Sequence, residues 1–250
     1  MGASPQRRRP PSTSTAELQA PAPGTTAAAA GKLPTARAVL AAACTTAGLD
    51  HTGARLIRFV GNAVFHLAHH PVVVKITLST RLWRRAGNAL AAARVLAAHR
   101  VPAVRPTAHP ARPVYVGPYP VTFWQQIHDD GPPPTMADLA GLLTQLHHIP
   151  LPHLPVAGLP GWDPVPDLRR RIAAAQDTDP DQLHFLRERC DEAAEKLAGL
   201  RYRLPRAVIH GDARLGNLIA SPQGPVLCDL DTTSIGPPEW DLVPAAVAAL

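Results

Sequence analysis

The stretch VIHGDARLGNLIASPQGPVLCDLDTTSIGPPEWDL, residues 208–242, carries more information about this chain than any other part of it. An apolar approach ends at His210, Asp212 follows two residues later, and Asn217 follows five residues after Asp212. A second apolar run then predicts a short buried strand with Asp229 at its end. Two acids and an amide in this order are suited to holding a divalent cation and orienting a hydroxyl group.

Phosphoryl transfer needs this combination, because the protein must orient the attacking hydroxyl, hold magnesium on the phosphates and neutralise the developing charge. In this interpretation Asp212 orients the acceptor hydroxyl, while Asn217 and Asp229 offer the oxygen ligands that Mg²⁺ prefers. His210 then supports the loop. A plainer interpretation is that these acids are turn residues, with Asp231 capping the following loop.

The segment resembles the catalytic core of the aminoglycoside phosphotransferase and choline kinase-like family, whose pattern is HGD, four residues, N, and an apolar strand ending in D. The resemblance covers the chain from about residue 50 onward. It implies that Asp212 is the catalytic aspartate and that Asn217 and Asp229 hold magnesium. It also implies that Asp241, in the later motif GPPEWDL, braces the catalytic loop, with Asp231 and His210 in supporting positions.

The same resemblance implies an α+β, protein-kinase-like two-lobed fold with a small β-rich N-lobe and a larger, mainly helical C-lobe. The implied activity is phosphorylation of a hydroxyl group on a small molecule, such as an aminoglycoside-like antibiotic or an amino alcohol. The implied cofactors are ATP, or GTP in its place, and Mg²⁺.

In the N-lobe, residues 56–78 predict a β-hairpin of two apolar runs joined by a polar turn. That polar turn is at residues 69–71. The resemblance places a different turn, at Gly61 and Asn62, over the nucleotide phosphates and gives Lys75 the α and β phosphates to bind. A lysine inside an apolar strand needs an anion nearby. The alternative is an edge-strand lysine that points to solvent. The turn has a single glycine and lacks the GxGxxG pattern, so it is a weak signal alone.

The Ala- and Leu-rich residues 82–99 predict a helix, on which kinase-like folds place a glutamate that pairs with the strand lysine. No Asp or Glu occurs between Lys75 and Trp124, and the glutamate position falls near Asn88 or Ala89. Either Asn88 offers a neutral hydrogen bond, or Lys75 pairs with Asp229 before the nucleotide binds. This departure supports a second hypothesis, a weak or inactive nucleotide-binding pseudoenzyme.

Residues 114–127 predict strands that lead into the connector between the lobes. The resemblance places the adenine against this connector, near Phe123 and Trp124, although Trp124 is equally explained as core at the lobe junction. In the C-lobe, Thr135 is a predicted N-cap for a helix with apolar positions from Met136 onward. Two further helices are expected around residues 167–175 and 180–200.

Composition divides the chain into a disordered tail at residues 1–36, rich in Ala, Pro, Ser and Thr, an N-lobe at 37–124 and a C-lobe at 125–250. The C-lobe ends in an apolar helix that has barely begun, so we expect part of the acceptor-binding lobe to be missing. Three widely spaced cysteines, the lack of an apolar signal-peptide region and the lack of a membrane span predict a cytoplasmic protein with reduced thiols.

The formal net charge of +6 is unevenly distributed. Residues 50–124 carry +9, and residues 125–250 carry −7. This division suits a site that holds phosphates in one lobe and a metal or cationic substrate in the other, although solvated helix faces explain it equally. No nucleic-acid-binding module accompanies the charge, so a nucleic-acid-binding protein is a minor alternative. No pattern indicates an oligomeric state.

Overall fold

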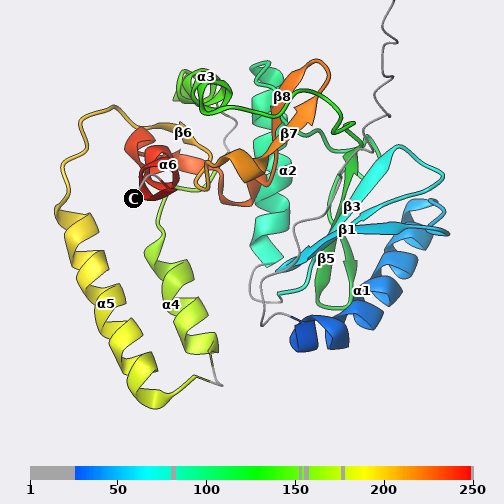
Figure 1. Cartoon of the computed structure of the whole chain (residues 1–250), viewed down its shortest axis with the longest axis horizontal. Coiled ribbons are helices and arrows are strands. Elements are labelled where there is room, and N and C mark those ends of the chain that lie inside the picture. The colour runs from blue at the N-terminus through cyan, green and yellow to red at the C-terminus, as the bar shows by residue number, and fades with distance from the viewer. Residues whose placement is uncertain (1–25, 80–82, 152–153, 155–157, 176–177, 249–250) are drawn as a thin grey trace, which may run out of the picture.

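We describe a computed structural model of the chain for residues 26–79, 83–151, 154, 158–175 and 178–248. A five-stranded antiparallel sheet and two helices occupy one side of the molecule, and the remaining helices and two small sheets occupy the other (Figure 1). The expected α+β architecture is therefore present. No helix in the described ranges is long and apolar enough to cross a membrane.

The five-stranded sheet has the order β1-β2-β3-β5-β4. Gly61, at a φ of 70°, makes the tight connection between β1 and β2, which requires a left-handed backbone that glycine adopts easily. The predicted single hairpin is thus two successive hairpins that share β2. The five strands are β1 Arg55–Val60, β2 Asn62–His66, β3 Val72–Thr77, β4 Val114–Val116 and β5 Tyr119–Gln125.

A helix covers one face of this sheet (Figure 1). This helix, α1 (Thr26–Ala47), begins ten residues before the expected end of the disordered tail at residue 36. Its fully buried Ala36 packs in the same hydrophobic cluster as Phe65 and Phe123 of the sheet. The tail boundary was wrong because an Ala-rich composition was taken as disorder, whereas alanine is also the strongest helix former. Residues 1–25 lie outside the described ranges.

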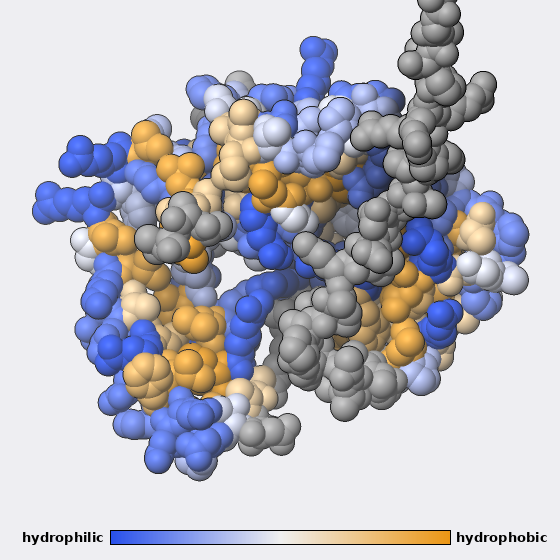
Figure 2. Space-filling model, viewed as in Figure 1, coloured by the Kyte–Doolittle hydropathy of each residue, from blue (hydrophilic) through white to orange (hydrophobic). Residues whose placement is uncertain are grey.

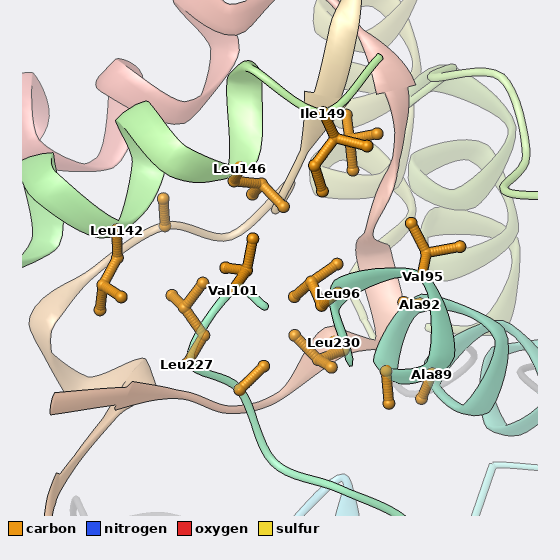
Figure 3. Packing of buried hydrophobic residues seen from close by; sticks show 14 of the residues in the cluster. Ala89, Ala92, Val95, Leu96, Val101, Leu142, Leu146, Ile149, Leu227 and Leu230 are labelled. Carbon is orange, nitrogen blue, oxygen red and sulfur yellow. The ribbon is translucent and has the colours of Figure 1, made fainter. Parts of the chain in front are cut away.

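A second hydrophobic cluster lies on the other side of the sheet, where α2 (Trp83–Ala98) packs against α3 (Met136–His147) and the strand that precedes Asp229. Figure 3 shows Leu96 of α2, Leu146 of α3 and Leu230 pointing into this cluster. Although α2 falls within the expected N-lobe, its buried side chains therefore belong to the core beneath residues 208–242, which we call the catalytic segment.

The predicted cap of α3 is present, because the Thr135 hydroxyl accepts a hydrogen bond from the Asp138 amide and the Asp138 carboxylate accepts one from the Thr135 amide. Two more helices, α4 (Val165–Ala174) and α5 (Pro180–Gly199), pack on each other as an arm that extends away from the body (Figure 1). The space-filling view is hollowed between this arm and the body (Figure 2).

The catalytic segment folds into two short antiparallel pairs and three turns of 3₁₀-helix. Strand β6 pairs with β9, and β7 pairs with β8. The elements are β6 Ala207–Ile209, η3 Leu215–Asn217, β7 Leu218–Ser221, β8 Gly224–Leu227, η4 Leu230–Thr232, β9 Ser234–Gly236, η5 Pro238–Leu242 and α6 Val243–Ala248.

Candidate active site

The catalytic loop leaves the buried strand β6 through His210 and Gly211. Gly211 has a φ of 83°, and a Cβ built on it would lie 2.5 Å from the carbonyl oxygen of Thr232. Only glycine fits both the backbone conformation and this close approach. The fully buried His210 accepts a hydrogen bond from the Asp212 amide at Nδ1 and donates one from Nε2 to the carbonyl of Cys228. His210 thus ties the loop to the residue before Asp229.

Asp241 holds the same loop from the opposite side. Its carboxylate is 1% exposed and accepts hydrogen bonds from the backbone amides of His210 and Gly211, both at 2.8 Å. His147 of α3 lies 3.0 Å away from the same carboxylate through its Nε2. A carboxylate that accepts several hydrogen bonds inside a protein fixes the geometry of its donors. Asp241 thus joins the start of the loop to α3.

The side chains of Asp212 and Asn217 meet at the mouth of the loop. The Asn217 amide donates to the Asp212 backbone carbonyl at 2.7 Å and to its carboxylate at 3.0 Å. Asn217 is 1% exposed, and its Oδ1 is buried without a hydrogen-bond partner in the described part of the chain. Such an orphaned oxygen is costly unless something else binds it. The Asp212 carboxylate is more exposed and lies 3.4 Å from the Arg214 guanidinium.

Asp229 follows β8 in a left-handed conformation, at a φ of 59°, which is uncommon for a residue other than glycine. The Lys75 ammonium, from β3, donates to Asp229 at 2.7 Å and to Asp231 at 2.8 Å. Arg58 of β1 lies 3.8 Å from the other Asp229 oxygen. Lys75 is therefore not an exposed edge-strand lysine, because it faces inward between two carboxylates.

Burial and charge act against each other in this cluster. Burial alone would lower the pKa of Lys75, but attraction to Asp231 and Asp229 outweighs it and raises that pKa. For Asp229, burial opposes ionisation, yet Lys75 holds the pKa below its ordinary value. For the more deeply buried Asp231, burial dominates and raises the pKa in spite of Lys75. Burial and the nearby Asp229 raise the pKa of the Cys228 thiol to about 12, so this thiol stays neutral at pH 7.

A cavity of about 280 Å³, which we call the interlobe cavity, lies between the sheet and the catalytic segment. Lys75, Asp229 and Asp231 stand at its polar end. Its remaining wall is mostly apolar, as in cavities that bind the flat base of a nucleotide. The apolar wall consists of Ile57, Val64, Val73, Ala89, Val104, Trp124, Ile127, Ile219 and Leu230.

A second cavity, of about 510 Å³, lies between α2, α4 and the catalytic loop, and we call it the α2–α4 cavity. Asp212 lines it together with Trp162 and Trp240, whose ring centres are 4.9 Å apart. Arg85 lines it as well and pairs with Asp167 at 2.6 Å. The Asp212 carboxylate is thus open to a cavity large enough for a small molecule.

A smaller third cavity shares lining residues with both the interlobe cavity and the α2–α4 cavity. It is lined by Gly61 and Asn62 of the first turn and by Asp212 and Asp229 of the catalytic segment. The structure therefore brings the predicted turn, Asp212 and one of the two predicted metal residues, Asp229, to one cavity. Residues separated by more than 150 positions in the sequence face each other here.

Two residues predicted at the connector have different surroundings. Phe123 is 1% exposed and packs in the core with α1, and its carbonyl accepts a hydrogen bond from Thr107, so it does not line the interlobe cavity. The alternation of β5 turns the Phe123 side chain to the other face of the sheet, so any contact of Phe123 with a nucleotide would come from its backbone. Trp124 lines the cavity and is also core.

Three site features lacked a clear signal in the sequence. Arg58 lines the interlobe cavity from β1, where an isolated arginine in an apolar strand gave no motif. Arg171 of α4 lines both the α2–α4 cavity and the smaller cavity. Lys75 pairs with two carboxylates, of which the sequence predicted only Asp229 as a partner. The signal that could have indicated Asp231 is the spacing D-L-D.

The sequence profile of the phosphotransferase enzyme family matches residues 60–249, which is most of the 250-residue chain. The chain belongs to this family. This phosphotransferase therefore has the kinase-like α+β fold and the class of activity that its catalytic segment indicated. A search of curated protein sequences gives no match.

Solved structures with a similar fold include aminoglycoside phosphotransferases, an amicoumacin kinase and a choline/ethanolamine kinase family protein. An aminoglycoside phosphotransferase, APH(3'')-Id from Streptomyces rimosus, has a TM-score of 0.60 at 19% identity, covering 82% of this chain and 80% of that one. An amicoumacin kinase bound to AMP-PNP, Ca²⁺ and Ami has a TM-score of 0.59 at 15% identity, covering 85% and 69%. A choline/ethanolamine kinase family protein from Mesorhizobium loti has a TM-score of 0.50 at 22% identity, covering 84% and 68%.

Proposed function

We propose that this phosphotransferase moves the terminal phosphoryl group of ATP to a hydroxyl group of a small molecule. The observation that carries the proposal is that Lys75, Asp229 and Asp212 line adjoining cavities, with Asn217 hydrogen-bonded to Asp212 beside them. A nucleotide that fills the interlobe cavity would end beside Lys75, and an acceptor in the α2–α4 cavity would meet Asp212. These are the positions that in-line transfer between two substrates requires.

The interlobe cavity supports a nucleotide as donor. Its apolar part has the character of a base-binding pocket, and its polar end supplies the ammonium of Lys75 and the guanidinium of Arg58 for phosphates. Positive charge there offsets the negative charge of a triphosphate. Solved neighbours were determined with GDP, AMP-PNP or ADP, so both adenine and guanine nucleotides are donors to test.

The residues around Asn217 fit a magnesium ion. The buried, unpartnered Oδ1 of Asn217 and the Asp229 carboxylate are hard oxygen donors of the kind that Mg²⁺ binds. No group of three or more His, Cys, Asp or Glu side chains in the described ranges forms a metal site of its own, so phosphate oxygens and water would complete the coordination. When bound, Mg²⁺ neutralises charge on the phosphates.

Asp212 is the proposed catalytic residue. Its carboxylate is held by the Asn217 amide and opens onto the α2–α4 cavity, where it can accept a hydrogen bond from an acceptor hydroxyl and orient it. The proton of that hydroxyl passes to the carboxylate as the oxygen attacks.

The acceptor class remains open within this proposal, and aminoglycoside-like antibiotics and amino alcohols are the first compounds to test. Solved neighbours were determined with kanamycin or spectinomycin bound. The α2–α4 cavity contains arginines as well as aspartates, so hydroxylated acceptors with a carboxylate belong in the same panel. Its two tryptophans offer apolar faces to the ring of an acceptor.

A pseudoenzyme is the alternative that the missing helix glutamate suggested. The two carboxylates at Lys75 favour an active enzyme instead, because the lysine has acidic partners without that glutamate. We also propose a cytoplasmic location, which supplies ATP and keeps thiols reduced. The three described cysteines are all free, in agreement with that setting.

The proposal is tested in two steps. First, ATP or GTP with Mg²⁺ should raise the melting temperature of the protein, because a ligand that binds the folded state stabilises it. Second, radiolabelled γ-phosphate should transfer to at least one member of a panel of aminoglycosides, amino alcohols, sugars and hydroxy acids. A shift without transfer across the panel would favour the pseudoenzyme, and no shift with either nucleotide would contradict nucleotide binding.

A further inference from the structure

The ammonium of Lys75 is shared between two carboxylates that stand two residues apart in the chain. It lies 2.7 Å from Asp229 and 2.8 Å from Asp231, and only 15% of the lysine side chain is exposed. The carboxylates approach it from one segment, β8 to η4, whereas kinase-like folds bring the second acid from the helix after β3. This arrangement raises the question of what the second acid, Asp231, does.

Helix α2 has no acid with which to pair. The cavity-lining residues of α2 are Arg84, Arg85 and Asn88 at the α2–α4 cavity and Ala89 at the interlobe cavity, and none of them is acidic. The Asn88 amide donates two hydrogen bonds, to the backbone carbonyls of Asp231 and Thr233, both at 2.9 Å. The helix thus contacts the backbone around Asp231 and leaves the lysine to the Asp231 side chain.

Asp229 cannot fill both roles when the nucleotide is present. As a magnesium ligand it would face a dication, and a metal competes with an ammonium for the same carboxylate oxygens. Lys75 would then lose one of its two partners at the moment it must hold phosphates. Asp231 is 9% exposed, and Lys75 is the only cation within 4.0 Å of its carboxylate in the described ranges. It is therefore the partner that Lys75 keeps.

We propose that Asp231 is a positioning residue that holds the Lys75 ammonium toward the nucleotide phosphates, in place of a glutamate on α2. The proposal rests on the proposed function, because it requires a nucleotide in the interlobe cavity. In this arrangement Asn88 fixes the backbone of η4 and so fixes the origin of the Asp231 side chain. The Lys75–Asp231 ion pair and the hydrogen bonds of Asn88 together take the place of a single glutamate on α2.

A double-mutant cycle separates this role from its rivals, because two residues that act through one interaction give non-additive effects. The four proteins are the full chain and its Asp231→Asn, Lys75→Met and doubly substituted variants. The measured quantity is the Kd for ATP by calorimetry, once with Mg²⁺ and once with EDTA. Asp130→Asn is the matched control, because it removes one solvent-exposed carboxylate outside the three cavities described above.

We expect Asp231→Asn to weaken ATP binding about tenfold, with and without Mg²⁺, and the control to change it less than twofold. In the Lys75→Met background, Asp231→Asn should have no further effect. A tenfold change corresponds to about 1.4 kcal/mol. Thermal unfolding of each variant reports folding. If Asp231→Asn does not fold, Asp231→Glu carries the same comparison, because it moves the carboxylate away from its present position.

Each other outcome gives a definite answer. A tenfold loss that persists in the Lys75→Met background would overturn the role through Lys75. A loss seen only with Mg²⁺ would instead make Asp231 a metal ligand. If the unsubstituted chain binds no nucleotide, the proposed function fails and this proposal fails with it, whereas the first two outcomes leave nucleotide binding intact.

Discussion

Removing the Asp241 carboxylate is expected to destabilise the protein strongly, because three donors depend on it. It is 1% exposed and accepts from the backbone amides of His210 and Gly211 at 2.8 Å, with His147 at 3.0 Å. Asp241→Ala leaves one buried and one partly buried amide without an acceptor, at about 1–3 kcal/mol each, and removes the partner of the histidine. We expect a loss of about 3–5 kcal/mol, a large part of the 5–15 kcal/mol typical of a domain.

The assay is urea unfolding monitored by tryptophan fluorescence. Trp162 and Trp240 form an aromatic pair, and their fluorescence reports the unfolding of this region. Glu239→Gln is the control, because the half-buried Glu239 carboxylate also accepts from two backbone amides, but these belong to the exposed residues Arg203 and Leu204. The control should lose markedly less stability. Equal losses for the two variants would refute the reasoning that burial makes Asp241 the brace of the catalytic loop.

Two further predictions concern the catalytic loop and the helix arm. Gly211→Ala should lower turnover at least tenfold and destabilise the folded protein by about 1–3 kcal/mol, since a Cβ would lie 2.5 Å from the Thr232 carbonyl. Gly141→Ala in α3 is the control, because a Cβ there has open space. Equal effects of the two variants on urea unfolding and on phosphate transfer to the acceptor would contradict this. Burial opposes ionisation of the Asp167 carboxyl, but Arg85 and Arg170 outweigh burial and hold the pKa of Asp167 below its ordinary value of 3.8. Ionised Asp167 therefore stabilises the folded protein above pH 3.8, and this stabilisation is lost as the pH falls through the folded-state pKa. The melting temperatures of the unsubstituted chain and Asp167→Asn should therefore differ at pH 7 and converge as the pH falls below 3.8 and through the folded-state pKa, and a constant difference would contradict this.

The catalytic segment was readable from the sequence because its geometry is local. His210, Asp212 and Asn217 lie on one loop, and Asp229 follows a strand whose apolar run marks its end. These residues are therefore close together both in the sequence and in space. The cap of α3 at Thr135 was readable for the same reason, since both partners of the capping box lie within four positions.

Interactions between distant segments were only partly readable. The pairing of Lys75 with Asp229 was one of two alternatives, and Asp231 as its second partner depends on how η4 turns after the left-handed Asp229. The face to which Phe123 points depends on the register of β5 against β3, which a short apolar run does not determine. The start of α1 was hidden because composition alone does not separate an Ala-rich helix from an Ala-rich tail.

The central claim is that Asp212 orients the acceptor hydroxyl for transfer from a nucleotide held by Lys75 and Asp229. The most direct measurement compares kcat and the Kd for MgATP of Asp212→Asn with those of the unsubstituted chain, using an acceptor found in the panel. We predict that kcat falls about 10²–10⁴-fold, the usual contribution of a general base, while the Kd changes less than threefold. An unchanged kcat would contradict the account.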